Sequence, residues 1–172
     1  MNSLNVFYRS VSKSFSFLKQ QDSIKHAYLN SIAIDDEGFL LPLCKCHLDD
    51  KILIEKLTAW RNENVSVYPT QFTATFESTN NWIVKGLLEV EDRILFLVVN
   101  NHGQTIGHIG FNNCHNDQKL LEVDNVVRGE NSVCKGLFSK ALHCMLTWAR
   151  KTINCEGFVL RVMDDNPHAI KF

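Results

Sequence analysis

The second half of the chain carries two apolar patterns of different period. Residues 93–100 are mostly apolar and rich in β-branched side chains, which predicts a buried central strand. Turn residues at 101–103 follow directly, so residues 105–111 should form a strand antiparallel to the first. Between 137 and 153, apolar side chains recur every three or four residues. That spacing predicts an amphipathic helix.

The first half of the chain has shorter patterns. Residues 1–37 are an N-terminal extension whose structure the sequence leaves open. An apolar cluster predicts a strand at 39–46, after which Asp49 or Asp50 caps a helix. A second helix is predicted to begin near Ser78. The apolar face of the first helix is predicted to consist of Ile52, Ile54, Leu57 and Trp60.

The most informative segment begins at residue 119. A strand-like run at 119–127 meets a loop at 128–136, which ends in a glycine directly before the helix, and a second strand follows at 157–163. This order aims backbone N–H groups and a helix N-terminus at one point, an arrangement that suits a pyrophosphate. A plain connecting loop has the same signature, so the pattern alone leaves both interpretations open.

This order of elements resembles the coenzyme A half of a GNAT-superfamily N-acetyltransferase. The resemblance rests on the sequences GLFSKAL at 136–142, LTWA at 146–149, FVLRV at 158–162 and NPHAIKF at 166–172. Upstream, the two strands joined by the predicted turn resemble the central hairpin of that family. The resemblance covers the chain from about residue 38 to residue 172. It implies an α/β fold, with a mixed, mostly antiparallel central sheet flanked by helices.

The C-terminal part of the family pattern is shorter here than in the family. After the segment at 166–172, the family continues into a tyrosine, the rest of a helix and two more strands. The resemblance therefore implies a domain at 38–172 that is incomplete at its C-terminus, with a sheet that lacks its last two strands. A fragment, a chain completed by another chain and a degenerate remnant all fit this pattern. Because the strand at 157–163 would then form an exposed edge, we also expect a homodimer through that edge.

The resemblance also implies where acetyl-CoA binds. The pantetheine arm would lie against the end of the 119–127 strand, and backbone N–H groups of the following loop would hold the pyrophosphate. The implied residues are Asn125, Val126, Val127, Arg128, Cys134, Lys135, Gly136, Leu137, Phe138, Ser139 and Asn166. Where the family usually has Arg or Gln and then Gly or Ala, this chain has Val133 and Phe138, and Arg128 or Lys135 would supply the missing charge. Backbone donors do not depend on side-chain identity, so the anion site can persist.

Two carboxylates are candidates for the base that deprotonates an amine. Glu122 and Asp124 share one face of their strand, next to the implied thioester, because side chains alternate along a strand. A polar strand face in water would have the same pattern. His108 on the adjacent predicted strand is a third candidate for proton transfer, although a single histidine can also be purely structural.

Three residues resemble those on the acceptor side of the active site in related enzymes: Trp60, Arg61 and Asn62. Together with the segment from Glu77 to Trp82, these residues are most similar to branches that acetylate amino-sugar nucleotides or protein N-termini. Arg61 would hold a phosphate or carboxylate of the acceptor, whereas an exposed arginine at a helix end needs no ligand. The implied function is acetyl transfer to a primary amine of a small molecule, with an amino-sugar nucleotide as first choice. The alternatives are acetylation of a protein N-terminus and a non-catalytic module that binds acyl-CoA or a protein.

Composition narrows the class of partner. The chain has 172 residues and a formal net charge of −1, with a pI near 6.6, so we expect neither nucleic acid nor an anionic membrane surface as partner. Of the six cysteines, Cys44 and Cys46 lie two apart on the predicted strand and would form half a metal site with His47. We predict instead no metal site, with reduced cysteines serving as small apolar residues of a cytoplasmic protein.

Overall fold

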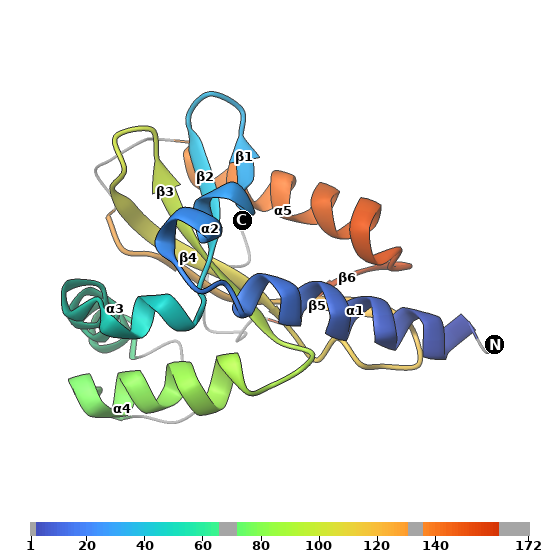
Figure 1. Ribbon diagram of the computed structural model, residues 1–172, viewed down its shortest axis with the longest axis horizontal. Helices are drawn as coiled ribbons and strands as arrows, with labels where there is room; N and C mark the ends of the chain where they lie inside the picture. Colours follow the sequence, from blue (N-terminus) through green and yellow to red (C-terminus); the bar gives the residue numbers. More distant parts are fainter. Residues whose placement is uncertain (1–2, 66–71, 131–135, 162–172) are drawn as a thin grey trace.

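A six-stranded sheet in the order β1-β2-β3-β4-β5-β6 forms the centre of the computed structural model, which describes residues 3–65, 72–130 and 136–161 (Figure 1). All neighbouring strands are antiparallel except β5 and β6, which run parallel. The predicted mixed, mostly antiparallel sheet is therefore confirmed. The strands are β1 Ile32–Ile34, β2 Gly38–Pro42, β3 Ile94–Asn100, β4 Thr105–Asn112, β5 Leu120–Arg128 and β6 Gly157–Leu160.

Helices cover both faces of the sheet. They are α1 Ser3–Lys19, α2 Ile24–Leu29, the 3-10 helix η1 Lys45–Asp49, α3 Lys51–Glu63, α4 Phe76–Asn81, the π-helix η3 Trp82–Leu88 and α5 Leu137–Ile153. Buried side chains of α1 and α5 form one core with one face of the sheet, while those of α3 and η3 form a second core with the other face. Strand β3 contributes to both cores and is buried along its whole length, as predicted for a central strand.

The N-terminal segment, whose structure the sequence left open, forms part of the same packed unit. Helix α1 places Phe7, Val11, Phe15 and Leu18 in the core that contains α5. The ring of Phe15 stacks on that of Phe111 in β4, with centroids 6.5 Å apart. Strand β1 adds to the edge of the sheet beside β2. No helix among the described residues is long and apolar enough to cross a membrane.

Several element boundaries differ from the prediction. Strand β2 ends at Pro42, so the predicted strand at 39–46 is wrong in its second half, because Cys44 caps η1 there. The second predicted helix begins earlier, at Phe76, since Thr75 and Ser78 form a reciprocal capping box. Ile52 is 79% exposed and not on the buried face of α3, which consists of Leu53, Ile54, Leu57 and Trp60.

The far edge of the described sheet is short. Strand β6 pairs with β5 from Leu120 to Val123 and ends at Leu160, whose side chain is half-exposed. Residues 162–163, the end of the predicted strand, lie outside the described residues. Association of two chains through this edge stays a prediction.

Candidate active site

A β-bulge interrupts the pairing of β4 with β5 at the point where the sequence placed the pantetheine arm. His108 pairs with Val127 and Gly110 with Asp124, so Asn125 and Val126 oppose a single residue of β4. Asn125 has a φ of 53°, in the left-handed region that asparagine tolerates better than most residues. The bulge shifts the register, so the side chains on its two sides do not follow one simple alternation.

A buried imidazole holds this bulge. His108 is fully buried, and its Nδ1 lies 2.7 Å from the carbonyl oxygen of Asn125. Because a carbonyl only accepts hydrogen bonds, Nδ1 carries the proton and donates it. Burial lowers the pKa of His108 to about 4, so the ring is neutral at pH 7 and Nε2 keeps its lone pair. Nε2 has no hydrogen-bond partner among the described residues.

This burial predicts an acid-sensitive fold. The pKa of His108 is about 4 in the folded protein and near 6.5 when the side chain is in water. The unfolded chain therefore binds a proton between pH 6.5 and 4 that the folded chain does not, and stability falls as the pH is lowered through this window. We expect this single group to account for a loss of about 3 kcal/mol, measured by urea unfolding at a series of pH values. His108→Gln should flatten that part of the profile, and an unchanged slope would contradict the assignment.

An apolar cleft opens beside the bulge, where β6 ends. It has a volume of about 150 Å³ and is lined by Val123, Val126, Leu142, Leu146, Phe158, Val159 and Leu160. These residues come from β5, β6 and α5, so the cleft lies on the α5 side of the sheet. Val126, one of the predicted coenzyme residues, is partly exposed there, whereas the side chain of Val127 is buried in the core on the α3 side. Val127 can therefore contribute to this cleft only through its backbone.

Helix α5 begins at Leu137, shortly after the end of β5 in the sequence. Gly136 is its N-cap residue, with a φ of 90° and no capping side chain. Of the predicted coenzyme residues here, Ser139 is exposed, whereas Leu137 and Phe138 are core residues. The guanidinium of Arg128 lies over the ring of Phe138, 5.6 Å from its centroid. Phe138, the departure from the family pattern, thus serves packing and keeps Arg128 near the start of α5.

Some predicted residues of this region lie outside the described residues. They are Val133, Cys134, Lys135 and Asn166. Their assignment to the coenzyme stays a prediction.

Both candidate carboxylates lie on β5, as predicted, but in different surroundings. One oxygen of Asp124, Oδ2, accepts hydrogen bonds from Arg93 at 2.8 Å and from the Asn125 amide at 2.6 Å. Both of these contacts are made by Oδ2, and the side chain is 32% exposed. Asp124 also immediately precedes the bulge. This carboxylate is therefore both oriented and accessible.

Glu122 is held farther from the bulge. It pairs with Asn112 of β4, and its Oε2 accepts a hydrogen bond from the Asn113 amide at 2.9 Å. The same oxygen lies 3.4 Å from Nε of Arg161, and the side chain is only 14% exposed. Of the two carboxylates, Asp124 is thus the better placed to meet a substrate near the bulge.

Two tryptophans from the α3 side converge on His108. The ring centroid of Trp60 in α3 lies 6.2 Å from that of His108, and the centroid of Trp82 in η3 lies 6.5 Å from it. Trp60 is buried against the backbone of Gly129, just after β5, where an added Cβ would lie 1.7 Å from Cε2 of the indole. Only a glycine at position 129 leaves room for Trp60 in this position.

Trp60 and Trp82 together form an aromatic wall beside His108, and Arg61 packs against this wall. Its guanidinium lies 4.8 Å from the ring centroids of both Phe72 and Trp82. Nη1 donates a hydrogen bond to Oγ1 of Thr79 at 3.1 Å. A planar guanidinium held on aromatic faces suits recognition of phosphate or carboxylate groups. Trp60 and Arg61 thus lie on the sheet face that carries His108, and their contact with an acceptor stays a prediction.

Asn62 has a different role from its two neighbours. Its side chain accepts from the backbone N–H of Ala74 at 2.7 Å and donates to the carbonyl of the same residue at 3.0 Å. It therefore ties the segment before α4 to α3. Arg93 and Gly129 also contribute to the site, although neither is among the residues predicted from the sequence. Arg93 stands at the start of a predicted strand, and a single glycine after a strand carries no signal of its own.

Comparisons with known proteins show the family and the fold of the chain. A model of the acetyltransferase (GNAT) domain matches residues 44–172. A probable acetyltransferase of the GNAT family from Chromobacterium violaceum is similar in structure, with a TM-score of 0.68 and 15% identity over 82% of this chain and 69% of that chain. No curated protein matches in a sequence search.

Two further structures share the fold. Apo FdhC, a nucleotide-linked sugar GNAT, has a TM-score of 0.60 and 16% identity over 80% of this chain and 75% of its own. The microcin C7 self-immunity acetyltransferase MccE was solved in complex with acetyl-CoA and AMP. It has a TM-score of 0.62 and 16% identity over 80% of this chain and 76% of its own. From the match over residues 44–172, the chain belongs to the GNAT family of acetyl-CoA-dependent acetyltransferases.

Proposed function

We propose that this protein transfers the acetyl group of acetyl-CoA to a primary amine of a small molecule, and that the acceptor is an amino-sugar nucleotide. The observation that carries the proposal is the succession of the bulge at Asn125, the apolar cleft at Val126 and the uncapped N-terminus of α5 at Gly136. An apolar cleft suits the pantetheine arm, and a helix N-terminus suits the pyrophosphate. Acetyl-CoA supplies the acetyl group as an activated thioester.

The proposed base is Asp124. An amine is protonated near neutral pH and must lose a proton before its nitrogen can attack a carbonyl carbon. Arg93 and Asn125 hold one carboxylate oxygen of Asp124, which fixes the carboxylate directly before the bulge while its side chain stays partly exposed. Asp124 accepts the proton there, directly or through a water molecule. As the new amide N–C bond is completed, the thioester C–S bond breaks and coenzyme A leaves as a thiolate, which takes up a proton from solvent. His108 acts as a positioning residue, because its hydrogen bond to Asn125 holds the bulge.

The backbone at the bulge provides the second part of the chemistry. Negative charge develops on the carbonyl oxygen of the acetyl group during attack, and backbone N–H groups can stabilise it without reorganising. Because the bulge breaks the regular ladder, it reorients peptide groups of β5 next to the cleft. The buried imidazole of His108 keeps those groups in place.

Arg61 supports the choice of acceptor. Its guanidinium is held between Phe72 and Trp82, on the sheet face that carries His108, where it would bind a phosphate of the acceptor. Two of the structures with this fold are in keeping with an acceptor that carries a nucleotide: one is described as a nucleotide-linked sugar GNAT, and the other was solved with acetyl-CoA and AMP.

Calorimetry with acetyl-CoA on the full 172-residue chain tests the proposal first. We expect one molecule bound per chain, and Gly136→Val should weaken binding at least tenfold. The valine both disfavours the left-handed backbone and crowds an anion at the helix N-terminus. Gly157→Ala, a glycine change away from that N-terminus, should bind like the parent. Thermal melts establish that each variant is folded.

The outcomes separate binding from catalysis. No heat and no thermal shift at millimolar acetyl-CoA would contradict the coenzyme site. If coenzyme binds, turnover is then measured with an amino-sugar nucleotide, with the same amino sugar without its nucleotide, and with a peptide that has a free N-terminus. Preference for the peptide would identify a protein N-terminal acetyltransferase. Coenzyme binding without turnover of any amine would identify a non-catalytic module.

A further inference from the structure

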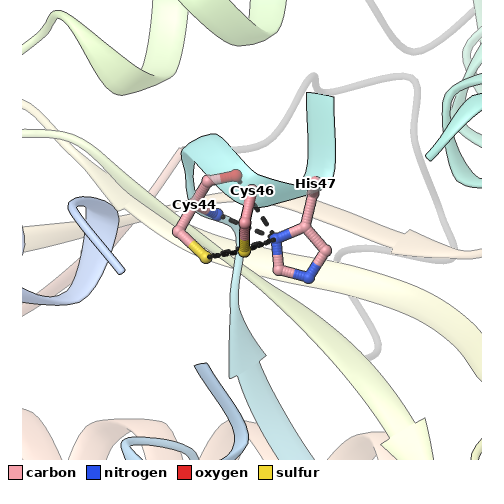
Figure 2. Close-up of side chains that lie close together, drawn as sticks. All are labelled: Cys44, Cys46 and His47. Atoms are coloured by element: carbon pink, nitrogen blue, oxygen red, sulfur yellow. Dashed lines mark hydrogen bonds between the residues drawn. The ribbon is translucent and has the colours of Figure 1, made fainter. Parts of the chain in front are cut away.

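Three metal-ligating side chains meet away from the candidate active site. Cys44, Cys46 and His47 point toward one another in the segment that joins β2 to α3 (Figure 2). The two sulfur atoms are 3.3 Å apart, and Nδ1 of His47 lies 3.3 Å from Sγ of Cys44 and 3.9 Å from Sγ of Cys46. Cys44 and His47 are buried, and Cys46 is partly exposed. We call these three residues the Cys-Cys-His cluster.

The local backbone explains why the three side chains converge. Cys44 is the N-cap residue of η1, and a 3-10 helix has three residues per turn, so residues 44 and 47 lie above one another. The sequence prediction of a strand through Cys46 placed the two cysteines on one face but gave His47 no defined position. The observed turn brings the imidazole nitrogen within reach of both sulfur atoms.

The spacing of the donor atoms fits a single tetrahedral ion. Bonds of about 2.3 Å to sulfur and about 2.0 Å to nitrogen place the ligands of Zn²⁺ about 3.5 to 3.8 Å apart. The observed separations of 3.3 to 3.9 Å differ from these values by at most about half an ångström, which small side-chain rotations can accommodate. A disulfide would require the sulfur atoms to be about 2.05 Å apart. The two cysteines are therefore free thiols in this arrangement.

The histidine presents the correct atom. The backbone N–H of Cys44 donates to Nδ1 of His47 at 3.2 Å, so in this tautomer Nδ1 carries a lone pair; the carbonyl oxygen of Cys44 lies 3.3 Å from the same nitrogen. The proton of the neutral ring is then on Nε2, which is buried and has no hydrogen-bond partner among the described residues. His47 also lines a cavity of about 490 Å³ between α2, α3 and the turn after β3. Of the three ligands only His47 lines this cavity, and the partly exposed Cys46 gives an ion its route to the cluster.

We propose that Cys44, Cys46 and His47 bind one Zn²⁺ ion, with a water molecule as the fourth ligand. Binding deprotonates both thiols, and the two protons are released to solvent. Nδ1 then bonds to the ion in place of the Cys44 N–H. The ion links the end of β2 to the start of α3, the helix that carries Trp60 and Arg61. This site is independent of acetyl transfer and can be tested without an acceptor.

The absorption spectrum of the cobalt-substituted protein identifies the metal ligands directly. The full chain is purified under reducing conditions, stripped with a chelator and titrated with Co²⁺. We expect a sulfur-to-cobalt charge-transfer band and the strong visible bands of a tetrahedral site, saturating at one ion per chain. Zn²⁺ should displace the cobalt and raise the thermal midpoint of the stripped protein by about 5 to 10 °C. Elemental analysis of the untreated protein should find one zinc per chain.

Matched cysteine variants decide whether the cluster is responsible. Cys46→Ser removes a partly exposed sulfur ligand and His47→Gln removes the nitrogen ligand, so each should weaken Co²⁺ binding and lower the intensity of the charge-transfer band. Cys144→Ser and Cys155→Ser change partly exposed cysteines elsewhere and should titrate like the parent. Weak or non-stoichiometric binding, a cobalt spectrum without sulfur ligation, or equal spectra in Cys46→Ser and the parent would each overturn the proposal. A mass decrease showing a Cys44–Cys46 disulfide in the reduced, stripped protein would do the same.

Discussion

Replacing Gly129 with alanine is expected to damage both the fold and the candidate acceptor site. The new Cβ would lie 1.7 Å from Cε2 of Trp60, so the indole must leave its buried position beside His108. Forcing a buried side chain out of its rotamer typically costs about 1 to 3 kcal/mol. Because Trp60 is also part of the aromatic wall, we expect any acetyl transfer to fall together with stability.

Urea unfolding and turnover measure the two effects of this change. Gly157→Ala is the control, since its Cβ would meet only the end of the Leu120 side chain, at 3.2 Å. A second variant that combines Gly129→Ala with Trp60→Leu should be less destabilised than the sum of the two single changes, because the smaller side chain relieves the clash. If Gly129→Ala were as stable as the parent, the contact between Trp60 and Gly129 would be wrong.

Changing Asp124 to asparagine should lower the rate of acetyl transfer about 100-fold, while the affinity for acetyl-CoA stays close to that of the parent. The amide keeps the size of the side chain and its hydrogen bond from Arg93 or Asn125, but it cannot accept the amine proton. The rate is measured with an acceptor found in the substrate panel, and coenzyme affinity is measured by calorimetry. Glu122→Gln should have a much smaller effect, since Glu122 lies two residues farther from the bulge.

Two comparisons separate proton transfer from packing. Arg93→Met leaves the carboxylate of Asp124 in place but removes the group that orients it, so it should reduce the rate less than Asp124→Asn. His108→Gln tests the bulge, and its loss of rate should accompany weaker coenzyme binding. If Asp124→Asn turned over like the parent and His108→Gln kept coenzyme affinity while losing activity, the base would be His108.

Elements with a local signal could be predicted from the sequence. The buried run of β3, the turn after it and the apolar period of α5 each depend on residues that are neighbours in the chain, and all three are confirmed. Boundaries were less predictable where two local signals competed. At the end of β2, an apolar run favoured a longer strand, but the cap formed by Cys44 and His47 satisfies the backbone in a 3-10 turn instead.

In the candidate site, too, features with a local sequence signal could be predicted and contacts between distant residues could not. The sequence indicated a coenzyme-binding order of strand, loop and helix, the two carboxylates on one strand face, and Trp60 with Arg61 on one helix. No local pattern indicated the hydrogen bond from His108 to Asn125 or the packing of Trp60 against Gly129. The same holds for the hydrogen bonds between the Asn62 side chain and the backbone of Ala74. Each of these contacts joins residues between 12 and 69 positions apart, which no local period can reveal.

The sequence by itself therefore determined the family, the order of the main elements and the residue types available for chemistry. Only the tertiary structure decided which of those residues lie together. It placed Asp124 beside a bulge with Arg93 as its partner, buried His108 as a neutral support, and turned His47 onto two thiols. The physical reason is that propensity and periodicity are properties of short segments, whereas orientation, burial and pairing of side chains depend on how strands and helices from distant segments pack.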